Sequence, residues 1–287
     1  MFQSPGWRNV TAGLLATVVL STACAPPNAV REFTAVAKDA ATRFPPLVKD
    51  LAESCIRRQL ASRPADEIAD VDDEARAACK DLLEPEPHLL GTLNVLVNYL
   101  NTLNQLASGA VVSYDKQIDA FASSVQAAGS FQETQVMAVR GLAKFLADAA
   151  AGGYRRKKTI GTLQAADTDV AALCDGLNRI VGEDYPRVLR NEENALRSRY
   201  RDAIQADPTK SLATALILQD SWRRDLESLN QKRSAARDFQ EILRKIRDGH
   251  KVLAAQANHW SAREVIQTIQ PYTDSIQSLL ADYRKVF

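Results

Sequence analysis

The chain has few of the residues that interrupt helices or mark specialised folds. Its 287 residues include 12 glycines and 11 prolines, only 6% of them are aromatic, and 3 are histidine. No run of alternating β-branched residues predicts a strand, and no repeat of about 34 residues is present. These scarcities argue against β-sheet and repeat architectures and favour an all-α protein.

The sequence also lacks the motifs of common catalytic and metal sites. It contains no nucleophile elbow, P-loop or dinucleotide-binding loop. His88, His250 and His259 do not have metal-ligand spacing. An acidic cluster lacks the central glycine of a calcium loop and is predicted to be a solvated connection; it comprises Asp66, Glu67, Asp70, Asp72, Asp73 and Glu74. We therefore expect no enzymatic activity, no metal and no cofactor.

Charge is nearly balanced. The 36 lysine and arginine residues stand against 35 aspartate and glutamate residues, so the electrostatic footprint of a nucleic-acid-binding protein is missing. Residues 154–158 (YRRKK) form one strong basic run. Such a run fits either a solvated helix end or a contact with anionic lipid head groups.

A short apolar run lies near the start of the chain. Residues 10–20 (VTAGLLATVVL) are uncharged, too short to span a bilayer, and typical of a signal-peptide core. The small residues Ser21, Thr22 and Ala23 then precede Cys24. This arrangement resembles the lipobox of bacterial lipoproteins, with Ser21 at the position where leucine is usual. A plain signal peptide and a short uncleaved anchor are the alternatives.

The resemblance implies a processing scheme and a location. Residues 1–23 would be the signal peptide, Cys24 the lipidated first residue, and residues 24–28 a tether to the membrane. No aspartate follows Cys24, which resembles the outer-membrane-sorted class of Gram-negative lipoproteins. We therefore expect a lipid-anchored, periplasm-facing protein of the cell envelope. Removal of residues 1–23 would take away Arg8 and leave 35 basic and 35 acidic residues.

Apolar periodicity predicts long helices. No proline or glycine lies between Pro208 and Gly249, and apolar residues recur there at steps of three, four and seven. This face comprises Leu212, Leu216, Trp222, Leu226, Leu229, Ala236, Phe239, Ile242 and Ile246. Asp207-Pro208 predicts the start of the helix and Gly249 its end, over about 60 Å. Residues 261–264 (SARE) predict a capping box for a last helix that Pro271 kinks.

Other glycines and prolines predict the helix boundaries. Breaks are expected at Gly129-Ser130, at Gly152-Gly153, and between Gly182 and Pro186. The resulting architecture is an elongated all-α bundle of long antiparallel helices over residues 85–287. Residues 29–84 are predicted to form a small N-terminal helical hairpin unit.

The cysteines fit this hairpin. Cys55 and Cys79 each lie twelve residues from Glu67, so an antiparallel hairpin would place the two thiols at the same height. In an oxidising compartment this favours a Cys55–Cys79 disulfide over two unpaired buried thiols. Cys174 lies in an apolar helical stretch and is expected to be a buried small hydrophobic residue.

Residues 89–114 contain no charged residue. Leucines including Leu93 and Leu100 form a broad apolar face, and four amide side chains share another side of the same helix. This amide row comprises Asn94, Asn98, Asn101 and Gln105. The segment fits the central helix of the bundle, with its amides bonded to neighbours or water. Alternatively, the amide row is a docking face for another protein, since interface cores are depleted in charge.

Two classes of function follow. The first is a lipid-anchored interaction or scaffold protein of the bacterial envelope that binds a protein partner along its helices. The second is an envelope ligand-binding protein that takes up lipid or cell-wall polymer in a groove between helices. An immunity-type inhibitor is a further alternative. The membrane, through lipidated Cys24, and an envelope protein are the expected partners.

Overall fold

The computed structural model describes residues 28–63, 71–112, 118, 121–122, 132–151, 156–209, 211–257 and 263–287. The described residues form helices and no β-strand, which confirms the predicted all-α class. The helices are α1 (Asn28–Ala41), α2 (Pro45–Ala61), α3 (Val71–Ala78), α4 (Lys80–Leu83), α5 (Glu86–Ser108), α7 (Glu133–Ala150), α8 (Arg156–Arg179), α9 (Tyr185–Ala206), α10 (Leu212–Ala255) and α11 (Arg263–Tyr283). A short π-helix, η1 (Ile180–Asp184), joins α8 to α9.

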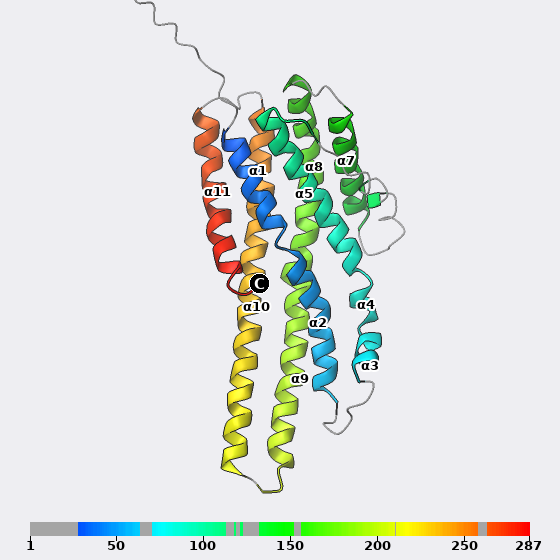
Figure 1. Cartoon of the computed structure of the whole chain (residues 1–287), viewed down its shortest axis with the longest axis vertical. Coiled ribbons are helices and arrows are strands. Elements are labelled where there is room, and N and C mark those ends of the chain that lie inside the picture. Colours follow the sequence, from blue (N-terminus) through cyan, green and yellow to red (C-terminus); the bar gives the residue numbers. More distant parts are fainter. Residues whose placement is uncertain are drawn as a thin grey trace, which may run out of the picture.

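Two long antiparallel helical columns run the length of the molecule (Figure 1). In one column α8, η1 and α9 follow each other without interruption, which gives a length of about 75 Å. In the other, the 44 residues of α10 return over about 66 Å. The prediction of an elongated bundle with long antiparallel helices is confirmed.

The remaining helices are distributed unevenly along these columns. Near one end, α1 packs against α5 and α11, α7 packs against α8, and α10 packs against both α8 and α11. Further along, α2 covers α9 and carries α3 on its outer side. Of the described helices, α9 and α10 extend furthest past the end of α2, so that the turn of this hairpin and the first turn of α1 lie at opposite ends of the molecule (Figure 1).

One large hydrophobic cluster holds the bundle together. It includes Phe33 and Phe44 from the N-terminal helices together with Tyr99, Phe239 and Tyr283 from the later ones, all essentially inaccessible to water. The Phe44 and Phe239 rings stack with centroids 4.9 Å apart. Helices from both sides of the predicted division at residue 84 contribute to this cluster.

The predicted disulfide is confirmed. Cys55 in α2 is bonded to Cys79, which lies between α3 and α4, with their Cα atoms 5.9 Å apart. The bond is packed with Ile56 and Ala75 in a second, small hydrophobic cluster. Glu67, the predicted midpoint of the connection, lies outside the described residues. The disulfide thus fixes the α3–α4 segment against α2.

The predicted ends of α10 are wrong by several residues. The N-cap is Ser211, whose hydroxyl accepts from the backbone N–H of Thr214 at 3.5 Å. Asp207 instead shapes the preceding turn, accepting from the backbone N–H groups of Thr209 and Ser211. Gly249 does not end the helix, which continues to Ala255. A Cβ at Gly249 would collide with the ring of Phe33, so the glycine serves close packing.

The predicted helix break between Gly182 and Pro186 is also not observed. The chain passes through this region as η1, and Pro186 lies in the first turn of α9. A Cβ at Gly182 would collide with the side-chain amide of Gln240, so this glycine allows α10 to pack closely against η1. Pro271 lies inside α11 as expected, whereas Ser261, Gly129 and Gly152 are outside the described residues.

Candidate functional site

The amide row lies on the water-facing side of α5. Asn94 is exposed, and Asn98, Asn101 and Gln105 are partly exposed, whereas the leucine face of the same helix is buried. The Asn98 amide donates to the backbone and side-chain oxygens of Asn94 at 2.8 and 2.9 Å. The Lys38 ammonium donates to Oδ1 of Asn101 at 3.2 Å. The row therefore makes hydrogen bonds both within itself and to Lys38 of α1, and its role in binding a partner stays a prediction.

Several predicted residues fall outside the described part of the chain. These are Cys24, His259, the start of the basic run at Tyr154 and part of the acidic cluster. Within the cluster's described part, Glu74 pairs with Arg63. No group of three or more potential metal ligands gathers among the described residues. Over the same residues, no helix combines the length and apolar character that crossing a bilayer requires.

Two predicted chemistry-bearing residues are buried in the core. Cys174 is a free, buried thiol as expected, and burial raises its pKa to about 12, so it is not a nucleophile at neutral pH. His250 is fully buried between α5 and α8. Its Nε2 lies 2.6 Å from the Tyr99 hydroxyl and its Nδ1 lies 2.8 Å from Oδ1 of Asp167. Both ring nitrogens are thus satisfied, and the histidine crosslinks three helices.

A larger buried polar group joins α2 to the α9–α10 hairpin. We call it the ion cluster; it comprises Asp50, Ser54, Arg57, Tyr185, Glu192 and Lys232. Oδ1 of Asp50 accepts from Arg57 at 3.0 Å and from Lys232 at 2.8 Å, and Oδ2 accepts from the Tyr185 hydroxyl at 2.6 Å. The cluster thereby binds α2, α9 and α10 to one carboxylate.

Glu192 completes the ion cluster from α9. One carboxylate oxygen accepts from Nε of Arg57 at 2.6 Å, and the other accepts from the Ser54 hydroxyl at 2.5 Å and from Arg57 Nη2 at 3.2 Å. Asp50 and Glu192 are 7% and 3% exposed, so two buried negative charges face the positive charges of Arg57 and Lys232. The buried charge is balanced.

The electrostatics of Asp50 follow from this pairing. Burial raises the pKa of its carboxyl, but hydrogen bonds from Lys232 and Tyr185 and the charge of Arg57 outweigh burial and leave the pKa below its usual range. Burial and the adjacent Asp50 carboxylate raise the pKa of the Tyr185 phenol. Asp50 is therefore ionised and Tyr185 is a neutral donor at physiological pH, which is the protonation pattern of a fixed structural joint.

Further along, polar and aromatic contacts keep α9 and α10 together. Arg233 donates to Glu193 at 2.6 Å, and the Tyr200 hydroxyl donates to Asp225 at 2.7 Å. The ring of Tyr200 also lies 6.1 Å from that of Trp222. These contacts hold α9 and α10 together between the ion cluster and the turn that joins the two helices.

The end of this hairpin exposes large apolar side chains. We call it the tip; it comprises Ile204, Leu212, Leu216 and Ile217, which are 37%, 74%, 55% and 66% exposed. The segment 211–219 (SLATALILQ) contains no charged residue. A half-open hollow of about 480 Å³ lies between the end of α9 and the start of α10 at this place. Exposed apolar groups gathered in this way mark interaction surfaces.

The tip also corrects the predicted apolar face of α10. Leu229, Ala236, Phe239, Ile242 and Ile246 are buried as expected. Leu212 and Leu216, from the same predicted face, are exposed, because α10 extends past the helices that cover its other half. Periodicity alone cannot distinguish a buried face from an uncovered one.

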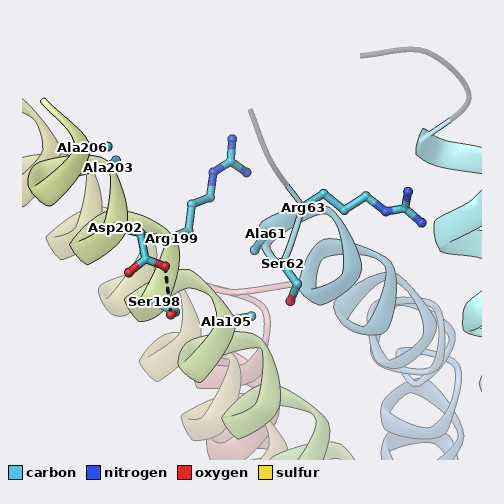
Figure 2. A pocket seen from close by; sticks show the side chains of 9 residues that line it. All are labelled: Ala61, Ser62, Arg63, Ala195, Ser198, Arg199, Asp202, Ala203 and Ala206. Carbon is cyan, nitrogen blue, oxygen red and sulfur yellow. Dashed lines mark hydrogen bonds between the residues drawn. The ribbon is translucent and has the colours of Figure 1, made fainter. Parts of the chain in front are cut away.

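A second hollow of about 480 Å³ lies between the end of α2 and α9 (Figure 2). Small residues of α9, including Ala195, Ala203 and Ala206, form one wall, and Ala61 and Ser62 form the other. The Ser198 hydroxyl donates to Asp202 at 3.2 Å, and the Arg63 side chain turns away toward Glu74. Among the described residues that line this hollow, no nucleophile, base and acid converge.

Comparison with known proteins gives no assignment. No family model matches the chain, and no curated protein or solved structure matches it either.

Asp169 gives a pH-dependent test of the core between α7 and α8. Its partly buried carboxylate packs against Gly141 and makes no ion pair with a described residue, and burial raises its pKa to about 6. The unfolded value is about 3.9, so ionisation destabilises the folded state increasingly from pH 4 to pH 6. Asp169→Asn should raise the free energy of unfolding at pH 7 by about 1 kcal/mol after allowance for partial exposure, and leave it unchanged at pH 4.

Urea denaturation at pH 7 and pH 4 measures this difference. Asp148→Asn, at an exposed position of α7, is the matched control and should change stability by less than about 0.5 kcal/mol at both pH values. An equal effect of Asp169→Asn at the two pH values would contradict the assignment.

Proposed function

We propose that this chain is a lipid-anchored interaction protein of the bacterial cell envelope that binds a protein partner through the tip of its α9–α10 hairpin. The observation that carries the proposal is the uncharged segment 211–219, which exposes Leu212, Leu216 and Ile217. The lipobox-like sequence ending at Cys24 supports the anchor. The proposed activity is binding, with no chemical step.

The positions of the two ends support a spacer role. Helix α1, which follows the predicted tether, begins at one end of the molecule, and the tip lies at the other (Figure 1). The length of α10 alone corresponds to about 66 Å. A chain anchored at Cys24 would therefore present the tip tens of ångströms from the membrane surface, where a partner in the periplasm could reach it.

The energetics of the tip favour a protein partner. Full burial of a leucine or isoleucine side chain contributes about 1.5–3 kcal/mol, so three such residues supply a substantial part of a binding free energy. Docking would desolvate no charge within 211–219, and the nearby Asp207 carboxylate already accepts hydrogen bonds from the backbone of Thr209 and Ser211. The ion cluster and the contacts of Tyr200 with α10 fix the hairpin before binding, which reduces the entropy lost on association.

The amide row is proposed as a second, polar contact surface. Asn94, Asn98, Asn101 and Gln105 lie along α5 and carry no charge. Their internal hydrogen bonds would have to be kept or replaced in a complex. For this reason the tip, which has no such competing interactions, is the primary site in this proposal.

Site-specific photocrosslinking in intact cells tests the proposal. A photoreactive amino acid at Ile217 should yield one discrete adduct, identified by mass spectrometry. The same substitution at Met137 is the matched control, because Met137 is an isolated apolar residue on α7 that is 58% exposed. The double change Leu212→Asp/Leu216→Asp should abolish the Ile217 adduct and leave the melting temperature within about 2 °C of wild type.

Two outcomes would refute this function. One is an equal adduct from Met137 and Ile217, which would indicate non-specific proximity. The other is an undiminished Ile217 adduct in the Leu212→Asp/Leu216→Asp variant, which would mean that the tip does not bind through its apolar residues.

A further inference from the structure

A different hollow lies where α8 passes into α9. It has a volume of about 230 Å³, and its apolar lining comes from Leu51 of α2, Leu82 of α4, Leu89 of α5 and Ile180 of η1. Arg179 and Arg187 also line it. It is thus an apolar hollow with two guanidinium groups among its lining side chains.

This hollow adjoins another of about 200 Å³. The two share Leu82 and Arg187, and the second extends to the Cys55 side of the disulfide, where Val188 and Arg58 line it. We call the pair the groove. It lies beside α2 and α9 and beneath the α4 segment that the Cys55–Cys79 bond fixes to α2. Part of the wall of the groove is therefore held in place by the disulfide.

The groove carries an excess of positive charge. Three arginines line it, and Asp184 is the only carboxylate among the described residues that line its two hollows. Asp184 accepts from Arg187 at 2.7 Å. Arg58 and Arg179 make no ion pair with any described residue. Two arginines that line the groove thus have no carboxylate partner among the described residues, which favours an anionic ligand.

A local irregularity of the helix also points to this place. Ile180 and Asp184, the first and last residues of the π-helix η1, both line the hollow. Single π-turns inside α-helices occur frequently at functional sites, where they displace backbone and side chains from regular positions. The π-turn and the unpaired arginines are independent observations that meet at the groove.

We infer that the groove binds one aliphatic chain that carries an anionic head group. The chain would lie on Leu51, Leu82 and Leu89. The head group would bind Arg179, and it would also bind Arg187 in place of that residue's present contact with Asp184. Ligand pockets commonly span about 300–1,000 Å³, so hollows of about 230 and 200 Å³ together lie near the small end of that range and suit one chain rather than a two-chain lipid. A carboxylate and a phosphate head group both satisfy the guanidinium geometry. This binding does not depend on the tip.

Ligand titration of the purified chain tests the inference. The exported Cys24→Ala chain is used after delipidation, so that no acyl group of its own competes. A fluorescent polyene fatty acid should bind saturably with one site per chain. Arg179→Glu/Arg187→Glu should weaken this binding at least tenfold, and Leu82→Trp should abolish it by filling the groove. Arg199→Glu, in the hollow of Figure 2, is the control and should bind as wild type does.

Competition distinguishes the two sources of the head group. Stronger displacement of the probe by unlabelled fatty acid identifies a carboxylate head group. Stronger displacement by a lysophospholipid identifies a phosphate head group. A neutral monoacylglycerol should compete at least tenfold more weakly than either. Unchanged affinity in Arg179→Glu/Arg187→Glu would overturn the inference, and so would equal competition by the neutral lipid. The arginine variants keep the test valid if Leu82→Trp fails to fold.

Discussion

Replacing Asp50 by alanine is expected to lower the free energy of unfolding by about 3–5 kcal/mol, and the melting temperature by about 10 °C. Three donors on three elements depend on this carboxylate: Arg57, Tyr185 and Lys232. Its loss would leave the buried Tyr185 hydroxyl without an acceptor. It would also leave Arg57 and Lys232 with one buried carboxylate, Glu192, where there were two. Uncompensated buried charge is among the costliest single changes in a protein.

Glu53 provides the matched control within α2. Its side chain is 47% exposed and pairs with Lys49 at 3.6 Å and with Arg57 at 3.8 Å. Exposed pairs contribute about 0–1 kcal/mol, so Glu53→Ala should change stability little. Equal destabilisation by Asp50→Ala and Glu53→Ala would show that the ion cluster does not stabilise the packing of α2 against α9 and α10.

The effect of Asp50→Ala should also depend on pH. The folded-state pKa of Asp50 lies below its usual range, so the contribution of the carboxylate is present at neutral pH and is lost as the pH falls below about 4. Urea denaturation of wild type and Asp50→Ala should therefore give a difference that shrinks on acidification.

The second large effect concerns the membrane. Cys24→Ala is expected to move the protein almost completely from the membrane fraction to the soluble fraction and to abolish its labelling with an alkyne fatty acid. Each buried methylene of an acyl chain contributes about 0.8 kcal/mol, and two or more chains anchor a protein stably. Cys174→Ala is the control, because Cys174 is buried in the core and should leave both labelling and fractionation unchanged.

Mass spectrometry of the mature N-terminus separates lipidation from the alternatives. A lipoprotein begins at a modified Cys24, whereas a plain signal peptide would leave an unmodified N-terminus. Membrane association of Cys24→Ala, together with absence of label in wild type, would show that the resemblance to the lipobox is misleading.

Features that depend on neighbouring positions in the chain could be predicted from the sequence. The apolar spacing of residues 208–249 predicted a long helix, and the equal distances of Cys55 and Cys79 from Glu67 predicted their bond. The end of that helix could not be predicted in this way. Gly249 is a packing position only because Phe33, from a distant part of the chain, lies against it.

The ion cluster and the groove could not be predicted for a similar reason. Arg57 and Lys232 resemble the solvated positive charges of any long helix, and Asp50 resembles a surface acid beside Lys49. Only the packing of α2 against α9 and α10 buries them together. The tip was missed because the apolar spacing of Leu212 and Leu216 is that of a buried face. The sequence of one helix does not specify how many other helices pack against it.

The π-helix η1 has a consequence for how this chain can change length. A π-turn closes its hydrogen bonds over five residues where an α-turn needs four, so η1 holds one residue more than a regular turn would. Deletion of residue Glu183 would convert η1 to regular α-helix and leave the same face of α9 packed against α2. The same loss inside α9 would rotate everything beyond it by about 100° and swing Glu192 away from Arg57. Single-residue deletions should therefore be tolerated within η1 and selected against in the helices on either side.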